Sequence, residues 1–206
     1  MFTAAPGAAR SACRCRYNPK PVTRTSVESV VSQRVALTCH PTTPCMAVRR
    51  IDVHVCRTQD GGLELRYVVD GDIDRLLIPA QGIPRRADRL WQHTCFEAFL
   101  AAEEAAYFEY NFAPSRQWAL YRFSAYREGM TPVDPGRAPR IGCEAAPGGL
   151  RLDVAVDAPL RVRRIALSAV VEDADRRLSY WALAHPPGQP DFHHPDAFAL
   201  CLERTA

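Results

Sequence analysis

In the stretch LWQHTCFEAFL (90–100), the side chains of an apolar strand face alternate with those of a more polar face. The stretches YFEYNFAP (107–114) and WALYRFSAYR (118–127) continue this alternation after short connections. In the first stretch, Phe96 and Glu97 fall on opposite faces, because successive side chains of a strand point in opposite directions. The three stretches therefore predict consecutive antiparallel strands in the middle of the chain.

The same alternation recurs on both sides of this stretch. It is found in RIDVHV (50–55), GLELRYVV (62–69), LRLDVAV (150–156), IALSAVVE (165–172), LSYWALA (178–184) and FALCLE (198–203). Roughly nine short strands with turn signals between them and no long helix predict an all-β fold, an antiparallel β-sandwich or barrel. The last two segments predict a closing hairpin whose loop is stiffened by four prolines.

Charge and hydropathy argue against two classes of partner. The 206 residues carry a net charge of +3, but the first 50 hold seven Arg and one Lys against a single acid, Glu28. The basic excess therefore falls ahead of the main domain, which argues against a nucleic-acid partner. No apolar run reaches the roughly 18 residues that a membrane helix needs, which argues against a membrane protein.

The N-terminal residues 1–36 lack the apolar core of a secretory signal, and we expect them to be a disordered or mis-started tail ahead of one domain at 37–206. The eight cysteines form no C-x-x-C motif. Scattered thiols of this kind are typical of a cytoplasmic protein with reduced cysteines.

Aromatic and polar residues gather on the central strands and near the end of the chain. Saccharides bind to flat aromatic rings through their apolar faces and to amides or carboxylates through their hydroxyls. The candidate ligand-binding residues are Trp91, His93, Glu97, Glu109, Asn111, Trp118, Tyr121, Trp181, His185, Asp191 and His193. The competing interpretation is that the tryptophans belong to the core and the acids to a solvated face.

Catalytic and metal sites are the other interpretations of these residues. Glu97 and Glu109 could form the carboxylate pair of a glycosidase, whereas no G-x-S-x-G motif supports a serine nucleophile. The segment 185–194 holds His185, Asp191, His193 and His194, but no established zinc spacing. We therefore assign no catalytic residue and no metal ligand. Met130 or Met46 with one of these histidines could ligate a haem.

The segments LWQHTCFEAFL, YFEYNFAPSRQWALYRF, SYWALAHP and PDFHH together resemble the bacterial DOMON-like proteins, and more distantly carbohydrate-binding module family 9. The resemblance covers about residues 37–203. It implies an immunoglobulin-like β-sandwich that binds a sugar or a haem. The positions that match are Trp91, Glu97, Asn111, Pro114 and Trp118.

The chain departs from the carbohydrate-binding pattern at two places. Thr94 and Cys95 stand where an acidic residue is usual, and Ser115 stands where glycine is usual. We therefore expect a non-catalytic domain that binds a small soluble ligand, with a saccharide or sugar derivative as the first choice. A haem-binding domain and a metal- or carboxylate-dependent hydrolase are the alternatives, and the oligomeric state stays open.

Overall fold

The computed structural model describes residues 31–58, 60–102, 105–158 and 162–202. Within them the chain forms 13 strands and three short 3-10 helices, so the all-β prediction is confirmed. No helix among these residues is long and apolar enough to cross a membrane.

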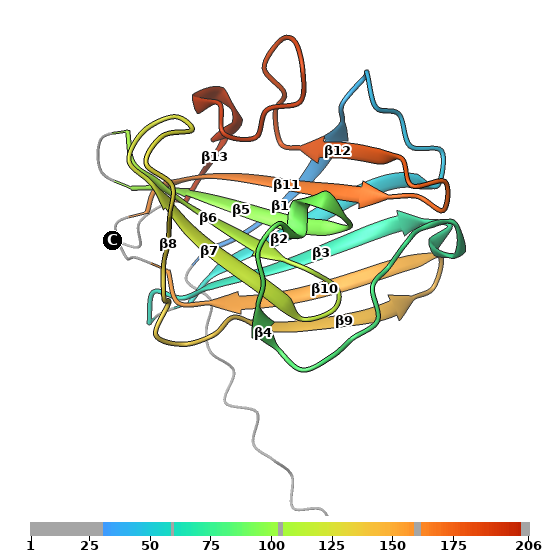
Figure 1. Cartoon of the computed structure of the whole chain (residues 1–206), viewed down its shortest axis with the longest axis horizontal. Coiled ribbons are helices and arrows are strands. Elements are labelled where there is room, and N and C mark those ends of the chain that lie inside the picture. The colour runs from blue at the N-terminus through green and yellow to red at the C-terminus, as the bar shows by residue number, and fades with distance from the viewer. Residues whose placement is uncertain (1–30, 59, 103–104, 159–161, 203–206) are drawn as a thin grey trace, which may run out of the picture.

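One continuous sheet contains all the strands and curls so that its two halves face each other (Figure 1). The first half consists of β1 (Val31–Cys39), β2 (Val48–Arg57), β3 (Leu63–Gly71), β10 (Gly149–Val156) and β9 (Arg140–Ala146). The second half consists of β12 (Leu178–Ala182), β11 (Arg164–Glu172), β5 (Cys95–Ala101), β6 (Tyr107–Phe112), β7 (Gln117–Phe123) and β4 (Arg85–Arg86), with β8 (Thr131–Pro132) beside β7 and β13 (Leu200–Cys201) beside β11.

Strand β1 joins the two halves. Its residues as far as Leu37 pair with β2, and its last two, Thr38 and Cys39, pair with β12. All the pairings are antiparallel except the short one between β4 and β7, which is parallel. The prediction of a purely antiparallel sandwich of about nine strands was therefore wrong in strand number and in this one pairing.

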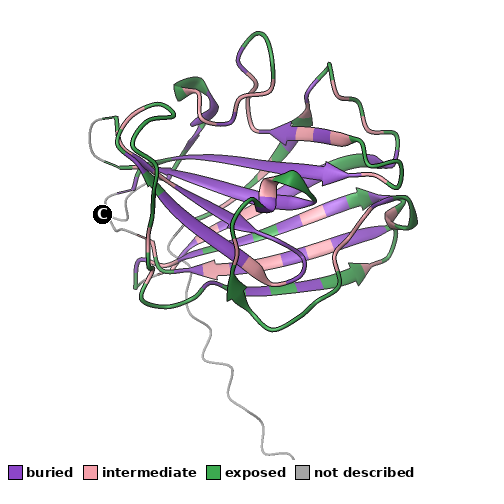
Figure 2. Cartoon of the chain, viewed as in Figure 1, coloured by how far each residue is buried: buried purple, intermediate pink, exposed green. Residues whose placement is uncertain are grey.

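The main core fills the space between the two halves. Alternate residues of β2 and β3 point inward, as the pleat of a strand requires, and meet the inward face of β5 and β6 (Figure 2). Tyr67 shows the contact: its ring lies 5.0 Å from that of Phe96, and its hydroxyl donates a hydrogen bond of 2.8 Å to the carbonyl of Glu97. Each aromatic ring buried here contributes about 2–3 kcal/mol of hydrophobic stabilisation.

A second apolar cluster covers the opposite face of β5, β6 and β7. Every residue of β5 up to Leu100 is buried, because a second layer packs on the outer face of this half. That layer is made by the segment around η2 (Leu90–Gln92) and by residues 183–199, which we call the cover loop. Phe99 of β5 meets Phe198 of the cover loop with ring centroids 6.4 Å apart.

The cover loop connects two strands that lie along the same side of β11 and does not close a hairpin. Strands β12 and β13 both pair with β11, on the edge opposite β5. The backbone N–H of Leu183 donates to Leu167 at the start of the loop, and that of Leu202 donates to Arg163 after its end. The predicted closing hairpin was therefore wrong, since β12 and β13 lie end to end along one neighbour. The loop contains η3 (Pro195–Ala197).

Four strands are absent from the sequence-based assignment: β1, β9 and the two-residue strands β4 and β8. Strand β1 begins at Val31, inside the predicted tail 1–36. The ordered domain therefore starts earlier than the predicted boundary at residue 37. Residues 1–30 lie outside the described residues, so the tail itself stays a prediction.

Candidate functional site

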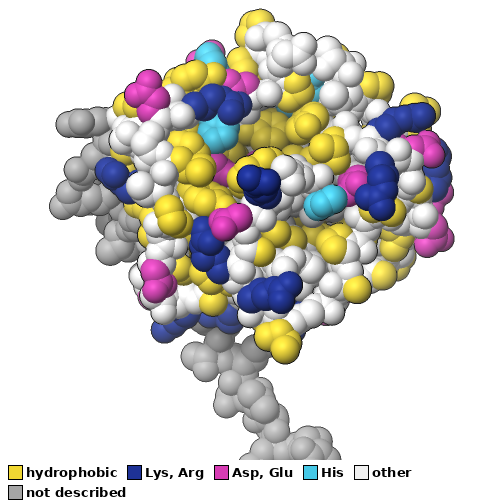
Figure 3. Space-filling model, viewed as in Figure 1, with side chains coloured by type: hydrophobic (Ala, Val, Ile, Leu, Met, Phe, Trp, Pro, Cys, Tyr) yellow, Lys and Arg dark blue, Asp and Glu magenta, His cyan; other side chains and the backbone are white. Residues whose placement is uncertain are grey.

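A cavity of about 450 Å³ lies on the outer face of the second half-sheet, between η2 and the cover loop. Figure 3 views this face and shows a hollow lined by apolar side chains, with histidine, basic and acidic groups beside it. The lining residues are Trp91, Glu97, Glu109, Phe123, Arg127, Met130, Val170, Tyr180, Pro190, Phe192 and His193.

Two buried glutamates form the polar wall of the cavity. Glu97 on β5 faces Asn111 on β6 in the ladder, and Glu109 lies two residues before Asn111 on the same strand. The three side chains therefore share one face, with the two carboxyls as diagonal neighbours. Glu97 is 2% exposed and Glu109 is 5% exposed, so both carboxyls have lost most of their contact with water.

Among the described residues, only neutral donors are hydrogen-bonded to the two carboxyls. The Ser168 hydroxyl donates to Oε2 of Glu97 at 3.1 Å, and Nδ2 of Asn111 donates to Oε1 of Glu109 at 2.7 Å. Asn111 is fully buried and accepts in turn from the Cys95 thiol at 3.5 Å. Among the hydrogen bonds of the described residues, none reaches Oε1 of Glu97 or Oε2 of Glu109.

Burial raises the pKa of both glutamates, because removing a carboxylate from water disfavours its charged form. The pKa of Glu97 lies well above its usual range, and the neighbouring charge of Glu109 raises it further. Burial raises the pKa of Glu109 to about 7, against a lowering by its hydrogen bond with Asn111 and by the charge of Arg127. Both carboxyls therefore hold their protons more strongly than an exposed glutamate does.

His193 closes the cavity from the cover loop. The Tyr107 hydroxyl accepts the backbone N–H of Arg127 at 3.2 Å, so its own proton is available for Nδ1 of His193 at 2.7 Å. This arrangement assigns the imidazole proton to Nε2, which lies 3.8 Å from Oε2 of Glu109. The ring packs edge-on against Phe123 at 5.0 Å, and burial lowers the pKa of His193 to about 4.

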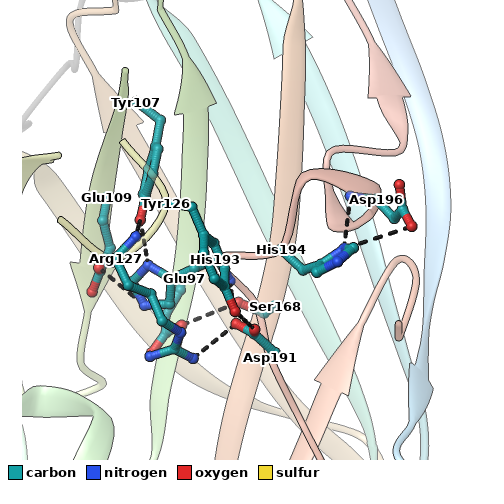
Figure 4. Close-up of polar contacts among 10 residues, drawn as sticks. All are labelled: Glu97, Tyr107, Glu109, Tyr126, Arg127, Ser168, Asp191, His193, His194 and Asp196. Atoms are coloured by element: carbon teal, nitrogen blue, oxygen red, sulfur yellow. Dashed lines mark hydrogen bonds and ion pairs between the residues drawn. The ribbon is translucent and has the colours of Figure 1, made fainter. Parts of the chain in front are cut away.

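A hydrogen-bonded group of Arg127, Tyr126 and Asp191 anchors the cover loop to the turn after β7. Nη2 of Arg127 donates to Oδ1 of Asp191 at 2.8 Å, and the Tyr126 hydroxyl donates to the same carboxylate (Figure 4). Asp191 also accepts the backbone N–H of His193 at 3.0 Å. These bonds lower the pKa of Asp191, so the carboxylate stays ionised and holds His193 in place.

Aromatic and thioether groups form the rest of the wall. Trp91 extends from η2 and meets Tyr121 edge to face, with ring centroids 6.2 Å apart. Tyr180 of β12 packs on Phe192 of the cover loop at 6.0 Å. Met130 stands at the rim with 53% of its surface exposed. The cavity therefore joins a carboxyl-rich wall to an aromatic wall.

Seven of the predicted site residues come together here. Four of them line the cavity: Trp91, Glu97, Glu109 and His193. Asn111, Tyr121 and Asp191 hold lining residues in position through the contacts described above. The structure therefore brings these seven side chains together, and their role in ligand binding stays a prediction.

The other four predicted residues lie elsewhere. Trp118 and Trp181 point into the main core, where Nε1 of Trp181 donates to the Ser179 hydroxyl at 3.0 Å, so the expected site shared by three tryptophans does not form. His93 contacts Glu172 at 2.7 Å and lines a different cavity of about 760 Å³. His185 donates from Nε2 to the carbonyl of Thr38 at 2.8 Å, at the junction of β1 and β12.

The described residues contain no group of three or more His, Cys, Asp or Glu side chains placed to hold a metal ion. The histidines of the cover loop have separate partners: His185 bonds to a backbone carbonyl, His193 bonds to Tyr107, and His194 accepts from the backbone of Asp196. Figure 4 shows His194 and Asp196 set apart from the cavity group.

A haem in this cavity would need an axial ligand that faces it. His193 is the one histidine among the described lining residues, with Nδ1 bonded to Tyr107 and Nε2 directed toward Glu109. Met130, the other axial candidate in the cavity, lies at its rim with 53% of its surface exposed. The two buried carboxyls also occupy a part of the cavity wall that would face the apolar porphyrin ring. The residues lining the cavity therefore do not fit a haem.

Sequence reasoning missed several residues of the site, among them Arg127, Ser168, Tyr180 and Phe192. Ser168 was detectable, since a lone hydroxyl within the apolar strand IALSAVVE suggests a polar neighbour. Arg127 had no such signal, because its position depends on a left-handed backbone with φ of 55° after β7.

No family model and no curated protein matches the chain. Among solved structures, a "putative carbohydrate-binding protein" from Bacteroides uniformis is 13% identical, with 84% of this chain and 86% of that chain covered and a TM-score of 0.50. This likeness concerns the fold. Family 9 carbohydrate-binding modules from Caldicellulosiruptor kristjanssonii, in complex with cellotriose and with glucose, are 12% and 14% identical over 74% of this chain, with TM-scores of 0.37 and 0.38.

Proposed function

We propose that this chain is a non-catalytic binding protein whose cavity between η2 and the cover loop holds a saccharide. The observation that carries the proposal is the combination of two kinds of wall in one cavity: the aromatic rings of Trp91 and Tyr180, and the carboxyls of Glu97 and Glu109. Saccharides carry both an apolar face and a ring of hydroxyls, so they need both walls at once.

The size and hydrogen-bonding capacity of the cavity support this ligand class. A volume of about 450 Å³ falls within the range of about 300–1,000 Å³ that small-molecule sites occupy. Oε1 of Glu97 and Oε2 of Glu109 accept no hydrogen bond from the described residues, and Nε2 of His193 faces them as a donor. The cavity therefore offers acceptors and a donor to the hydroxyls of one sugar unit.

The fold likeness adds support of a different kind. The Bacteroides uniformis protein, whose fold matches over most of both chains, carries the name "putative carbohydrate-binding protein". The motifs of the central strands also resemble the DOMON-like group, and we propose that the chain belongs to it.

Calorimetric titration against a panel of mono- and oligosaccharides tests the proposal, with Trp91→Ala as the variant. His93→Ala is the matched control, since His93 is close in sequence but lines the other cavity. We expect binding by the wild type and by the control, and a loss of about tenfold or more for Trp91→Ala. Equal affinity of Trp91→Ala and wild type would move the binding site away from this cavity.

The non-catalytic part of the proposal has its own test. A raised pKa beside a second carboxyl is also the arrangement of a glycosidase acid, so Glu109 next to Glu97 makes hydrolysis the second candidate function. Prolonged incubation with each bound oligosaccharide, followed by chromatography, should return the oligosaccharide intact. If shorter products form with the wild type and do not form with Glu109→Gln, the protein is a hydrolase and the non-catalytic part of the proposal is wrong.

A further inference from the structure

We infer that the preferred ligand of this cavity carries a protonated amine, as an amino sugar does, and that the amine lies between Glu97 and Glu109. The inference rests on the proposed function and names the class of saccharide. Its first support is geometric: each carboxyl has one oxygen held by a neutral donor and one oxygen that receives no hydrogen bond from the described residues. An ammonium group supplies several donors from a single atom and can reach both oxygens.

The second support is that no positive group among the described residues is hydrogen-bonded to either carboxyl of this pair. Arg127 is the basic side chain that lines the cavity, and its charge favours ionised Glu109, but its guanidinium is bonded to Asp191. His193 is buried among aromatic rings and lies 3.8 Å from Glu109, beyond hydrogen-bond distance. Buried carboxylates are costly unless a positive group accompanies them. A cationic ligand would supply that charge, which the hydroxyls of a neutral sugar cannot.

The aromatic wall favours the same ligand. The described residues place Trp91, Tyr180, Phe123 and Phe192 around the cavity that the two glutamates line. The faces of such rings attract cations, and the attraction grows when the site excludes water. An amine held by the glutamates therefore meets a wall suited to its charge, while the sugar ring that bears it stacks on the same side chains.

Binding of an amine should release protons, whereas binding of a neutral sugar through its hydroxyls should not. Both carboxyls hold protons more strongly than usual in the free protein, because burial raises the pKa of Glu97 and of Glu109. An ammonium group between them favours the ionised form of each. Binding of the amine should therefore release protons to the buffer, and the heat of binding should depend on the ionisation enthalpy of the buffer.

The experiment compares matched saccharides that differ only in the amine. Oligomers of glucosamine and of N-acetylglucosamine are titrated calorimetrically into the full chain, in two buffers of different ionisation enthalpy. We expect the amine to bind about tenfold or more tightly than its acetylated partner, with proton release. Glu109→Gln should abolish that preference while His93→Ala keeps it, and Glu97→Gln provides a second variant should Glu109→Gln fail to fold.

Each outcome decides between the inference and the proposed function. Equal affinity for the amine and its acetylated partner, or a preference for the acetylated one, overturns the inference and leaves saccharide binding standing. A protein that binds neither oligomer nor any other saccharide overturns both. Methylammonium serves as a cation that has N–H donors but no sugar. If it binds with the affinity of the amino sugar and no saccharide competes, the site is a cation site and the proposed function fails.

Discussion

Nε2 of His193 lies 3.8 Å from Oε2 of Glu109, and burial makes both groups neutral over one range of pH. The pKa of His193 falls to about 4 and that of Glu109 rises to about 7, so between these values the imidazole and the carboxyl are both uncharged. The contact is therefore not an ion pair in the unliganded protein. The two groups give the stability of the fold opposite dependences on pH: burial of His193 lowers stability as pH falls from 6.5 toward about 4, and burial of Glu109 lowers it as pH rises from 4.5 toward about 7.

Glu109→Gln should stabilise the protein in alkaline solution. The pKa of Glu109 is raised from 4.5 to about 7 in the fold, so the folded state binds more protons in that window and stability falls as pH rises through it. Glutamine keeps an oxygen for Asn111 and has no charge to bury. We expect a gain of about 2–3 kcal/mol at about pH 8 and little gain below about pH 5, measured by urea unfolding. A gain of the same size at both pH values would contradict this account.

Removal of the Tyr107 hydroxyl should loosen His193. Tyr107 is 4% exposed, and its hydroxyl bonds to both His193 and the backbone of Arg127. We expect Tyr107→Phe to destabilise the fold by about 1–2 kcal/mol and to weaken ligand binding, because the imidazole loses its orientation. Tyr126→Phe is the comparison for stability: it removes the exposed hydrogen bond to Asp191 in the anchor of the cover loop, and a smaller loss, below about 0.5 kcal/mol, is expected there. Thermal unfolding of both variants provides the comparison.

Two tryptophans should separate binding from stability. Trp181 is 4% exposed in the main core, so Trp181→Ala should cost about 3–5 kcal/mol of folding free energy. Trp91 is only half-buried and lines the cavity, so Trp91→Ala should cost less than about 2 kcal/mol while removing saccharide binding. Denaturant unfolding and calorimetry on both variants measure the two effects; the reverse ranking of stabilities would place Trp91 in the core.

Two glycines in neighbouring strands should respond oppositely to alanine. A Cβ added at Gly149 would lie 1.8 Å from the carbonyl oxygen of Val69, whereas one added at Gly142 meets nothing within 4 Å. Gly149→Ala should therefore destabilise the protein by about 2 kcal/mol or more, because backbone must shift. Gly142→Ala should be neutral or stabilising by up to about 1 kcal/mol through the unfolded state. Unfolding midpoints of the two variants, measured side by side, test the register of β9, β10 and β3.

The central strands were predictable because one physical signal, the pleat, governs both faces. Alternation alone put Phe96 and Glu97 on opposite faces, and the structure keeps them there. The same rule could have excluded one predicted residue: Trp118 and Tyr121 are separated by an odd number of positions, so they cannot share a face of β7. Trp118 accordingly lies in the main core, while Tyr121 supports Trp91.

The second layer could not be predicted from any local pattern. His193 meets Tyr107 through a hydrogen bond that spans 86 residues of sequence. The burial of Glu97 and Glu109 depends on that layer, so their raised pKa values follow from tertiary structure alone. Periodicity assigned polar residues on this face to solvent or ligand and had no means of indicating that the cover loop would remove most of the water.

The end-to-end placement of β12 and β13 along β11 makes the cover loop an exchangeable module. Both of its ends are fixed by backbone hydrogen bonds to one strand, at Leu183 and Leu202, so the length and sequence between them can change without altering the sheet register. Natural variants and designed libraries could therefore diversify this segment as antibody loops are diversified. The two glutamates, which belong to the sheet, would stay in place beneath each new cover.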